Sequence, residues 1–374
     1  MKSLCFFLLS LFPFLLLFAQ KQRPVTIVQS ATVAFRPTKP FDHFTTNSNT
    51  YSARNAYLTM LASRECYLDV VGARNESEYS RLVRPVFEEW GFERVAFLRN
   101  SRTSTQCIVA SKSDMVLITF RGSEFGAPPT AVGASIDING WRRAASIELP
   151  NVLLESAVKD WVATDAHLAP MSGPRWSGSK VHAGFGTALE SIIDRIISEL
   201  NGPAAASNKP VYVTGHSLGG ALAVLAAFRL KKAGFRVAGA YPHAAPKVGD
   251  IVFSAKYAAL GIPTFRTVHF RDLVPTFPGP EMVAAYNRMV QNRALLDGRK
   301  ARGSDLIAAY THVPAKLKYI SRDGSIFTNP SPQTVARDQG PVLRFRDHDS
   351  FRYCLQLYNA LSPEEQRSLQ PPAR

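Results

Sequence analysis

The middle of the chain alternates short apolar runs with longer helical segments, and this alternation constrains the fold more than any other feature. We expect strands at residues 211–214, 237–241 and 264–269, and helices at residues 219–233 and 250–260. Strands separated by helices of this length run parallel, because each helix returns the chain to the start of the next strand. The pattern therefore predicts an α/β fold with a mainly parallel central sheet flanked by helices. Catalytic side chains in such sheets lie at the carboxyl ends of the strands.

A Gly-x-Ser-x-Gly pattern at residues 215–219 connects the first of these strands to the following helix. This five-residue pattern occurs in many unrelated proteins, so it is weak evidence by itself. A strand before it and a helix after it are typical of a nucleophile elbow, the sharp turn that presents the serine of α/β-hydrolases. Its glycines tolerate the tight backbone, and the helix directs the positive end of its dipole toward Ser217. The alternative is that Ser217 only caps the helix. We expect Ser217 to be the nucleophile.

A serine nucleophile needs a histidine base and an acid that orients the base, and in α/β-hydrolases the acid and then the histidine follow the serine. Asp272 comes just after the strand expected at residues 264–269, where the acid belongs. Asp250 is the competitor, but its place at the head of an expected helix favours an N-cap. The sequence therefore predicts Asp272 as the acid.

Two histidines follow the acid. His348 lies in a polar loop after a strand-like run at residues 341–345, a setting that suits an exposed and adjustable base. His312 precedes another strand-like run and is more easily a packing residue. We therefore predict His348 as the base. We expect its neighbours Asp347 and Asp349 to be solvated loop charges, because adjacent residues in an extended loop point apart.

The tetrahedral intermediate of acyl transfer carries a negative oxygen that needs hydrogen-bond donors fixed in place. One expected donor is the backbone N–H of Leu218, the residue after the nucleophile. The second is expected in the turn after the strand-like run at residues 115–120, where Ser123 offers its N–H and its hydroxyl. An ordinary turn at Ser123 is the alternative.

The N-terminal half of the chain shows different patterns. The expected elements are helices at residues 53–68 and 79–90, and a hairpin of strands at residues 106–110 and 115–120. No internal repeat or long linker divides the chain. We therefore expect one domain at residues 51–362, followed by a C-terminal tail at residues 363–374.

Residues 1–19 have the layout of a secretory signal peptide, with Lys2 before an apolar run that ends at Ala19. The run is too short to span a bilayer and Pro13 interrupts it, so we expect cleavage instead of a retained anchor. The mature chain is therefore expected to be secreted, either extracellular or periplasmic, with no transmembrane segment. An irregular arm at residues 20–50 would precede the domain.

The composition excludes a disordered or fibrous protein, since 46% of the 374 residues are hydrophobic and 20% are charged. The formal charge of +15 favours anionic surfaces, but the basic residues are scattered, which argues against a nucleic-acid partner. Cys66, Cys107 and Cys354 lack the spacing of zinc ligands and are expected to be buried structural residues. We expect no metal and no cofactor.

Six segments of the chain match, in order, the motifs of a known family. They are residues 120–123, Asp160-Trp161 with Asp165, and residues 181–185, 215–220, 245–249 and 272–275. Through them the sequence resembles the class 3 lipase family, the fungal triacylglycerol lipase-like branch of the α/β-hydrolases, over residues 51–360.

The resemblance implies the α/β-hydrolase fold, a triad and an oxyanion hole. The triad would be Ser217, Asp272 and His348, and the oxyanion hole would be formed by Ser123 and Leu218.

One departure from the family pattern is an enlarged insertion at residues 124–159, where family members carry the lid over the active site. We predict a larger lid or access loop there, and a surface excursion without a gating role is the alternative. The resemblance also implies that His182 and His312 are structural.

These features predict a secreted serine hydrolase that cleaves carboxylic esters of lipids through an acyl-serine intermediate, with its substrate at an interface. A phospholipase or a non-lipid carboxylesterase on the same scaffold is the first alternative. A catalytically silent protein that binds lipid or a polyanion is the alternative from another class.

Overall fold

The computed structural model describes residues 39–46, 49–67, 76–122, 169–202, 208–303, 306–340 and 345–369. All of them belong to one compact unit of the chain. Several predictions fall outside the described residues: the signal peptide, the insertion at residues 124–159, Ser123, and the matches at Asp160, Trp161 and Asp165.

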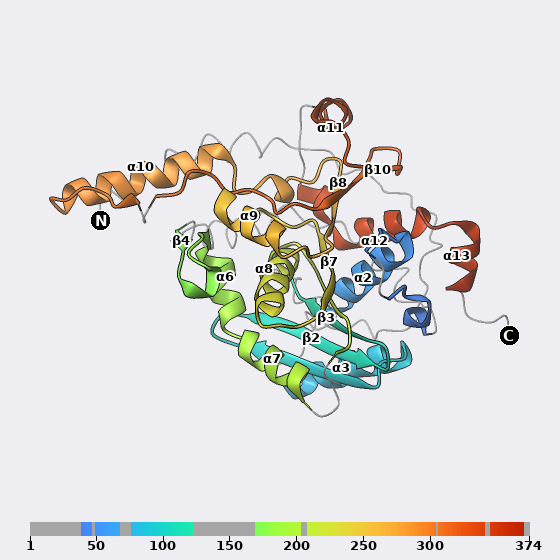
Figure 1. Cartoon of the computed structure of the whole chain (residues 1–374). Helices are drawn as coiled ribbons and strands as arrows, with labels where there is room; N and C mark the ends of the chain where they lie inside the picture. The colour runs from blue at the N-terminus through green and yellow to red at the C-terminus, as the bar shows by residue number, and fades with distance from the viewer. Residues whose placement is uncertain are drawn as a thin grey trace, which may run out of the picture. The chain divides into compact units, whose positions relative to one another are not determined.

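A central sheet of eight strands organises the described part of the chain (Figure 1). In sheet order the strands are β1 (Arg94–Asn100), β2 (Thr105–Lys112), β3 (Met115–Phe120), β6 (Val211–His216), β7 (Val237–His243), β8 (Phe265–His269), β9 (Lys316–Ile320) and β10 (Ile326–Thr328). Strands β3, β6, β7, β8 and β9 run parallel to one another, and antiparallel pairs form both edges. The predicted α/β fold with a mainly parallel sheet is confirmed.

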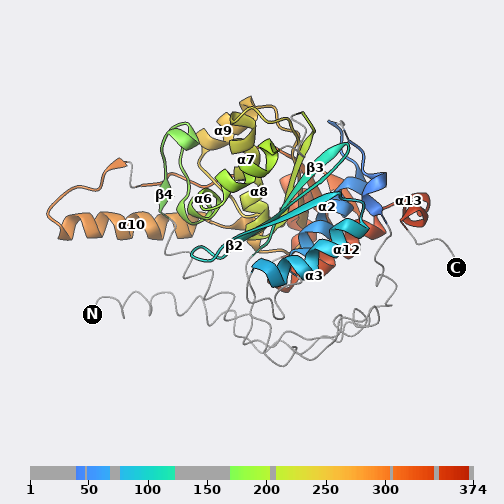
Figure 2. The ribbon, with the colours of Figure 1, turned by 90° about the horizontal axis from the view of Figure 1, so that it is seen from below.

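Helices cover both faces of this sheet (Figure 2). One face carries α6 (Ala183–Glu190), α7 (Ile193–Asn201), α8 (Leu218–Lys232) and α9 (Ile251–Ala259), and the other carries α2 (Ala53–Glu65), α3 (Glu76–Glu89) and α12 (Ser350–Asn359). The side chains of each strand point alternately to the two faces of the sheet, so each strand contributes to the core on both faces. In β6, Val211 and Val213 belong to the core under α8, whereas Tyr212 belongs to the core under α2.

The remaining elements are short or peripheral. They are η1 (Pro40–His43), β4 (Pro170–Met171), η4 (Pro174–Trp176), β5 (Val181–His182), η5 (Val274–Thr276), α10 (Pro280–Leu296), α11 (Pro332–Gln339), η7 (Phe345–His348) and α13 (Pro363–Ser368). Among the described residues, no helix is both long enough and apolar enough to cross a membrane.

The sequence patterns locate most elements to within a few residues. Helix α2 starts where predicted and ends three residues early, and α3 starts three residues before its predicted start. Strands β2 and β3 form the predicted hairpin. Helix α10 was not predicted, and the strand-like run at residues 341–345 ends in the helical turn η7, with residues 341–344 outside the described part.

The three cysteines Cys66, Cys107 and Cys354 are buried and form no disulfide with one another. Burial raises the pKa of the Cys354 thiol to about 12 and raises that of Cys107 well above its usual value. Both thiols are therefore protonated at neutral pH and poor nucleophiles, as expected of structural residues.

Candidate active site

Ser217 lies in a sharp turn between β6, which ends at His216, and α8, which begins at Leu218. Its backbone angles are φ 60° and ψ −129°, in a region that side chains other than glycine rarely adopt. Such strain costs about 1–3 kcal/mol and persists only where the surrounding structure imposes it. The side chain is fully buried, and within the described part of the chain its Oγ has no hydrogen-bond partner.

Close backbone contacts explain the glycines on both sides of the serine. A Cβ on Gly215 would lie 2.2 Å from the carbonyl of Gly219, and a Cβ on Gly219 would lie 2.3 Å from the carbonyl oxygen of Phe120. Both distances are far shorter than a van der Waals contact. The two glycines therefore let the start of α8 pack against the ends of β6 and β3, which fixes the turn.

The backbone N–H of Leu218 is the predicted oxyanion donor that the structure describes. It belongs to the first residue of α8, where N–H groups have no partner within the helix. The carbonyl of Ser217 already accepts the N–H groups of Gly220, at 2.9 Å, and Ala221, at 3.2 Å. Ser123, the other predicted donor, lies just beyond the described residues, which stop at Gly122.

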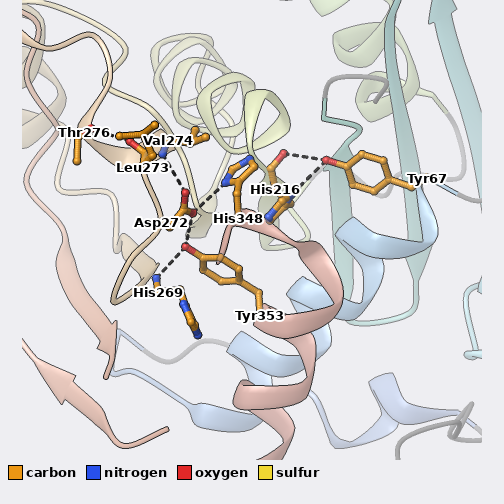
Figure 3. Close-up of polar contacts among 9 residues, drawn as sticks. All are labelled: Tyr67, His216, His269, Asp272, Leu273, Val274, Thr276, His348 and Tyr353. Carbon is orange, nitrogen blue, oxygen red and sulfur yellow. Dashed lines mark hydrogen bonds and ion pairs between the residues drawn. The ribbon is translucent and has the colours of Figure 1, made fainter. Parts of the chain in front are cut away.

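Asp272 and His348 form a buried pair (Figure 3). Asp272 follows β8 and precedes η5, and His348 is the last residue of η7. His348 Nδ1 lies 2.9 Å from Asp272 Oδ2, so the imidazole donates this hydrogen to the carboxylate. The opposite ring atom, Nε2, is then the one that can accept a proton from a nucleophile.

The carboxylate of Asp272 accepts two further hydrogen bonds. Its Oδ1 accepts the N–H of Val274 at 2.9 Å, and its Oδ2 accepts the hydroxyl of Tyr353 at 2.7 Å. Tyr353 Oη in turn accepts the N–H of His269 at 2.8 Å. Burial and the neighbouring carboxylate raise the pKa of Tyr353, so it remains a neutral donor. These hydrogen bonds fix the carboxylate of Asp272 in place.

His216 connects the elbow to this pair. Its ring centroid lies 4.6 Å from that of His348, with an interplanar angle of 33°. Burial lowers the pKa of His216 well below its usual value, and the nearby His348 and His243 lower it further. His216 is therefore neutral at physiological pH. The side chain next to the serine thus packs on the ring of the predicted base.

Tyr67, in the turn after α2, supports the elbow from the other side. Its Oη lies 3.2 Å from His216 Nδ1 and 3.4 Å from the His216 carbonyl oxygen (Figure 3). A Cβ on Gly122 would lie 1.8 Å from the same Oη, so Tyr67 packs directly on the residue before Ser123. Tyr67 and Tyr353 were missed in the sequence, because neither belongs to a motif and both reach the site only through the fold.

The other histidines and the alternative acid form contacts outside the Asp272–His348 pair. His312 Nε2 lies 2.8 Å from the Pro275 carbonyl oxygen and donates to it, which holds η5 in place. Asp250 caps α9, with its carboxylate accepting the N–H of Phe253 at 2.7 Å. His182 stacks on Phe185 with ring centroids 4.1 Å apart.

Two expectations about the loop around His348 are wrong. His348 is buried and not exposed, since η7 places it against Asp272. Asp347 is also buried and pairs with Arg352 Nη1 at 3.2 Å, so it is not a solvated charge. Asp349 is exposed as expected, but it caps α12 by accepting the N–H of Phe351.

Comparison with known proteins identifies relatives of part of the chain. The family model described as lipase (class 3) matches residues 154–282, a segment that includes Ser217 and Asp272 and ends before His348. A lipase of Rhizomucor miehei is 37% identical over 128 residues, which cover 33% of this chain and 35% of that protein. The secreted mono- and diacylglycerol lipase A of Penicillium cyclopium is 37% identical over 123 residues, or 33% of this chain and 40% of that protein. The similarity thus spans about a third to two fifths of the length of these relatives.

Among solved structures, the triacylglyceride lipase of Rhizomucor miehei matches with a TM-score of 0.50 and 20% identity. The match covers 78% of this chain and 90% of that one. At this identity the similarity concerns the fold alone. It agrees with the predicted α/β-hydrolase fold.

Proposed function

We propose that this chain belongs to the class 3 lipase family and that it hydrolyses carboxylic esters of lipids through an acyl-enzyme intermediate on Ser217. The observation that carries the proposal is the buried Asp272–His348 pair, which packs against the residue that precedes the strained serine. A serine, an oriented imidazole and a buried carboxylate are the groups that nucleophilic acyl transfer requires.

In the proposed mechanism, His348 Nε2 takes the proton of the Ser217 hydroxyl as Oγ attacks the ester carbonyl. The negative oxygen of the tetrahedral intermediate is stabilised by the N–H of Leu218 and by Ser123. The intermediate expels the alcohol, which receives the proton from His348, and leaves the acyl group on Ser217. Water, deprotonated by His348, then attacks the acyl carbonyl. The second tetrahedral intermediate breaks the bond to Ser217 Oγ, which takes the proton back from His348, and the carboxylic acid leaves. Asp272 fixes the tautomer of the imidazole throughout.

Access to the serine is part of the proposal. Ser217 is fully buried, and we propose that its surroundings move before a substrate reaches it. We assign this gating role to the insertion at residues 124–159, within a catalytic domain at residues 51–362 and ahead of the tail at residues 363–374. The insertion lies outside the described residues, and its role remains a prediction.

The proposed substrate is an acylglycerol or a related lipid ester at an interface. The relatives that match this chain are lipases, one of which is a secreted mono- and diacylglycerol lipase. Because one of these relatives is described as secreted, we also propose that this chain is secreted after removal of residues 1–19. A phospholipase or a soluble carboxylesterase would use the same triad and differ in what the pocket accepts.

An ester panel on the purified protein tests this function. The panel contains emulsified triacylglycerol, diacylglycerol, phosphatidylcholine and soluble p-nitrophenyl butyrate, with Ser217→Ala as the control. We expect emulsified acylglycerols to be the best substrates and Ser217→Ala to lose activity by about 10⁴-fold or more. Preferred hydrolysis of phosphatidylcholine or of the soluble ester would favour the alternatives, and equal activity of Ser217→Ala would overturn the mechanism.

A further inference from the structure

The second half of α10 and the segment that follows it, residues 288–303, form a projection that extends away from the central sheet (Figures 1 and 2). We call it the α10 projection. Nearly all of its side chains are exposed or half-buried. Ala294 is buried because the chain folds back over it, with the N–H of Arg299 donating to the Ala294 carbonyl at 2.9 Å.

The base of the α10 projection is fixed to the rest of the fold. Asn287 Nδ2 donates to the carbonyl of Ile307 at 2.7 Å, and Asn287 Oδ1 accepts the N–H of Ile307 at 3.1 Å. Ile307 packs in a small apolar cluster with Val283. Lys180 Nζ donates to the carbonyl of Gly303 at 2.8 Å, which holds the returning segment. These contacts give the projection a defined orientation.

Exposed apolar side chains are concentrated on the projection, and two of them belong to the last two residues of α10. Leu295 is 70% exposed, Leu296 is 83% exposed and Met289 is 45% exposed. They are three of the six large hydrophobic side chains that are exposed in the described part of the chain. Exposed large apolar side chains that gather in one segment are typical of surfaces that bind another apolar phase.

Basic residues flank these apolar residues in the sequence. The projection carries five of them, Arg288, Arg293, Arg299, Lys300 and Arg302, against one acidic residue, Asp297. Asp297 is engaged by Arg293 Nε at 3.4 Å and by Arg299 Nη2 at 3.9 Å. Leucines among basic residues are typical of segments that insert into a lipid interface while their cations meet anionic headgroups.

Building on the lipid-ester hydrolysis proposed above, we propose that the α10 projection docks the protein on an anionic lipid surface. Helix α10 begins at Pro280, eight residues after Asp272, so the docked surface would lie on the connection that also carries the acid. The segment that matches the family model ends at residue 282, so the projection lies beyond it.

Vesicle binding tests the proposal without any need for catalysis. The Ser217→Ala protein is sedimented with phosphatidylcholine vesicles that either contain or lack phosphatidylglycerol. One variant adds Leu295→Ser and Leu296→Ser, and its control adds Phe327→Ser, which removes a 44%-exposed apolar side chain on β10. A second variant adds Arg288→Ser, Lys300→Ser and Arg302→Ser. Its control removes the same charge from exposed sites elsewhere, by Lys232→Ser, Arg337→Ser and Arg367→Ser.

We expect the parent protein to bind the anionic vesicles more tightly, and both projection variants to bind at least about tenfold more weakly than their controls. In the Ser217 background, hydrolysis of soluble p-nitrophenyl butyrate should be the same in each variant and its control. Equal binding of variants and controls, or no preference for anionic vesicles, would overturn the proposal. Binding by a protein that cleaves no ester would instead overturn the proposed function and leave the docking intact.

Discussion

The hydroxyl of Tyr353 lies 2.7 Å from the same Asp272 oxygen that His348 Nδ1 approaches to 2.9 Å. Because both groups donate to one oxygen, they share its negative charge. Tyr353 stays protonated, since burial and the adjacent carboxylate raise its pKa. The tyrosine therefore positions the proposed acid, Asp272, and moderates the charge that its carboxylate presents to the imidazole.

Replacing Tyr353 by Phe should lower kcat/KM about tenfold, because a hydrogen bond to a charged group is lost from the acid. The carboxylate would then carry more charge toward His348 and favour its protonated form. The acid limb of the kcat/KM profile should move to higher pH. The measurement is the pH dependence of soluble-ester hydrolysis.

Tyr319→Phe provides the matched control for this variant. It removes a tyrosine hydroxyl that donates to Asp338 Oδ2 at 2.9 Å, a tyrosine–carboxylate bond away from the candidate site. It should leave both the rate and the pH profile unchanged. A Tyr353→Phe profile identical to that of the unsubstituted protein would show that the tyrosine is only structural.

Tyr67→Phe tests the support of the elbow. Loss of the hydroxyl removes its contacts with the ring and carbonyl of His216, beside Ser217. We expect kcat to fall about tenfold, while the free energy of unfolding falls by about 1 kcal/mol. Tyr257→Phe is the control, because it removes a buried hydroxyl bonded to Thr264 Oγ1 at 2.8 Å. Equal activity losses in the two variants would contradict a positioning role.

Gly219→Ala should prevent correct packing of the elbow. The added methyl would lie 2.3 Å from the backbone oxygen of Phe120, which β3 holds in place. We expect a loss of unfolding free energy of about 3 kcal/mol or more, or no folded protein. Gly303→Ala adds the same methyl where no atom lies within 4 Å, and its denaturation midpoint should stay unchanged. A Gly219→Ala midpoint equal to that of this control would contradict the packing argument.

The buried His243 should make the free energy of unfolding depend on pH. Burial lowers its pKa to about 3, whereas an unfolded histidine titrates near 6.5. Between these values the unfolded state binds a proton that the folded state does not. The stabilisation is therefore complete above about pH 6.5 and is lost as the pH falls toward 3, by about 1.4 kcal/mol per pH unit. Burial lowers the pKa of His216 as well, so it acts in the same direction.

His243→Gln should flatten this dependence. Glutamine does not titrate, and its amide can still bond to Thr59, whose Oγ1 lies 3.1 Å from His243 Nε2. Urea denaturation at several pH values between neutral and acidic measures the slope of the unfolding free energy. An unchanged slope would mean that His243 is not neutral in the folded protein.

Local patterns in the sequence were sufficient to predict the sheet and the turn at Ser217. The spacing of apolar residues predicts strands and helices, and the pattern around Ser217 states which turn must join them. Asp272 could be predicted as the acid because a carboxylate just past a strand already has a defined place in a parallel sheet. Each of these predictions depends only on residues that lie close to one another in the sequence.

The rest of the site depends on tertiary contacts. The burial of His348 depends on the packing of η7 against Asp272, although its own sequence is polar. Tyr353 and Tyr67 lie on or near helices from opposite ends of the described chain, and only the fold brings them to the triad region. Helix α10 was missed because its exposed half has no apolar stripe that predicts burial.

The most direct test of the central claim is mass spectrometry of the protein after reaction with an active-site fluorophosphonate. The account predicts a single phosphonylated residue, Ser217, with labelling abolished in Ser217→Ala and strongly slowed in His348→Asn. Labelling of a different residue, or equal labelling of the Ser217→Ala protein, would contradict the assignment of Ser217 as the nucleophile.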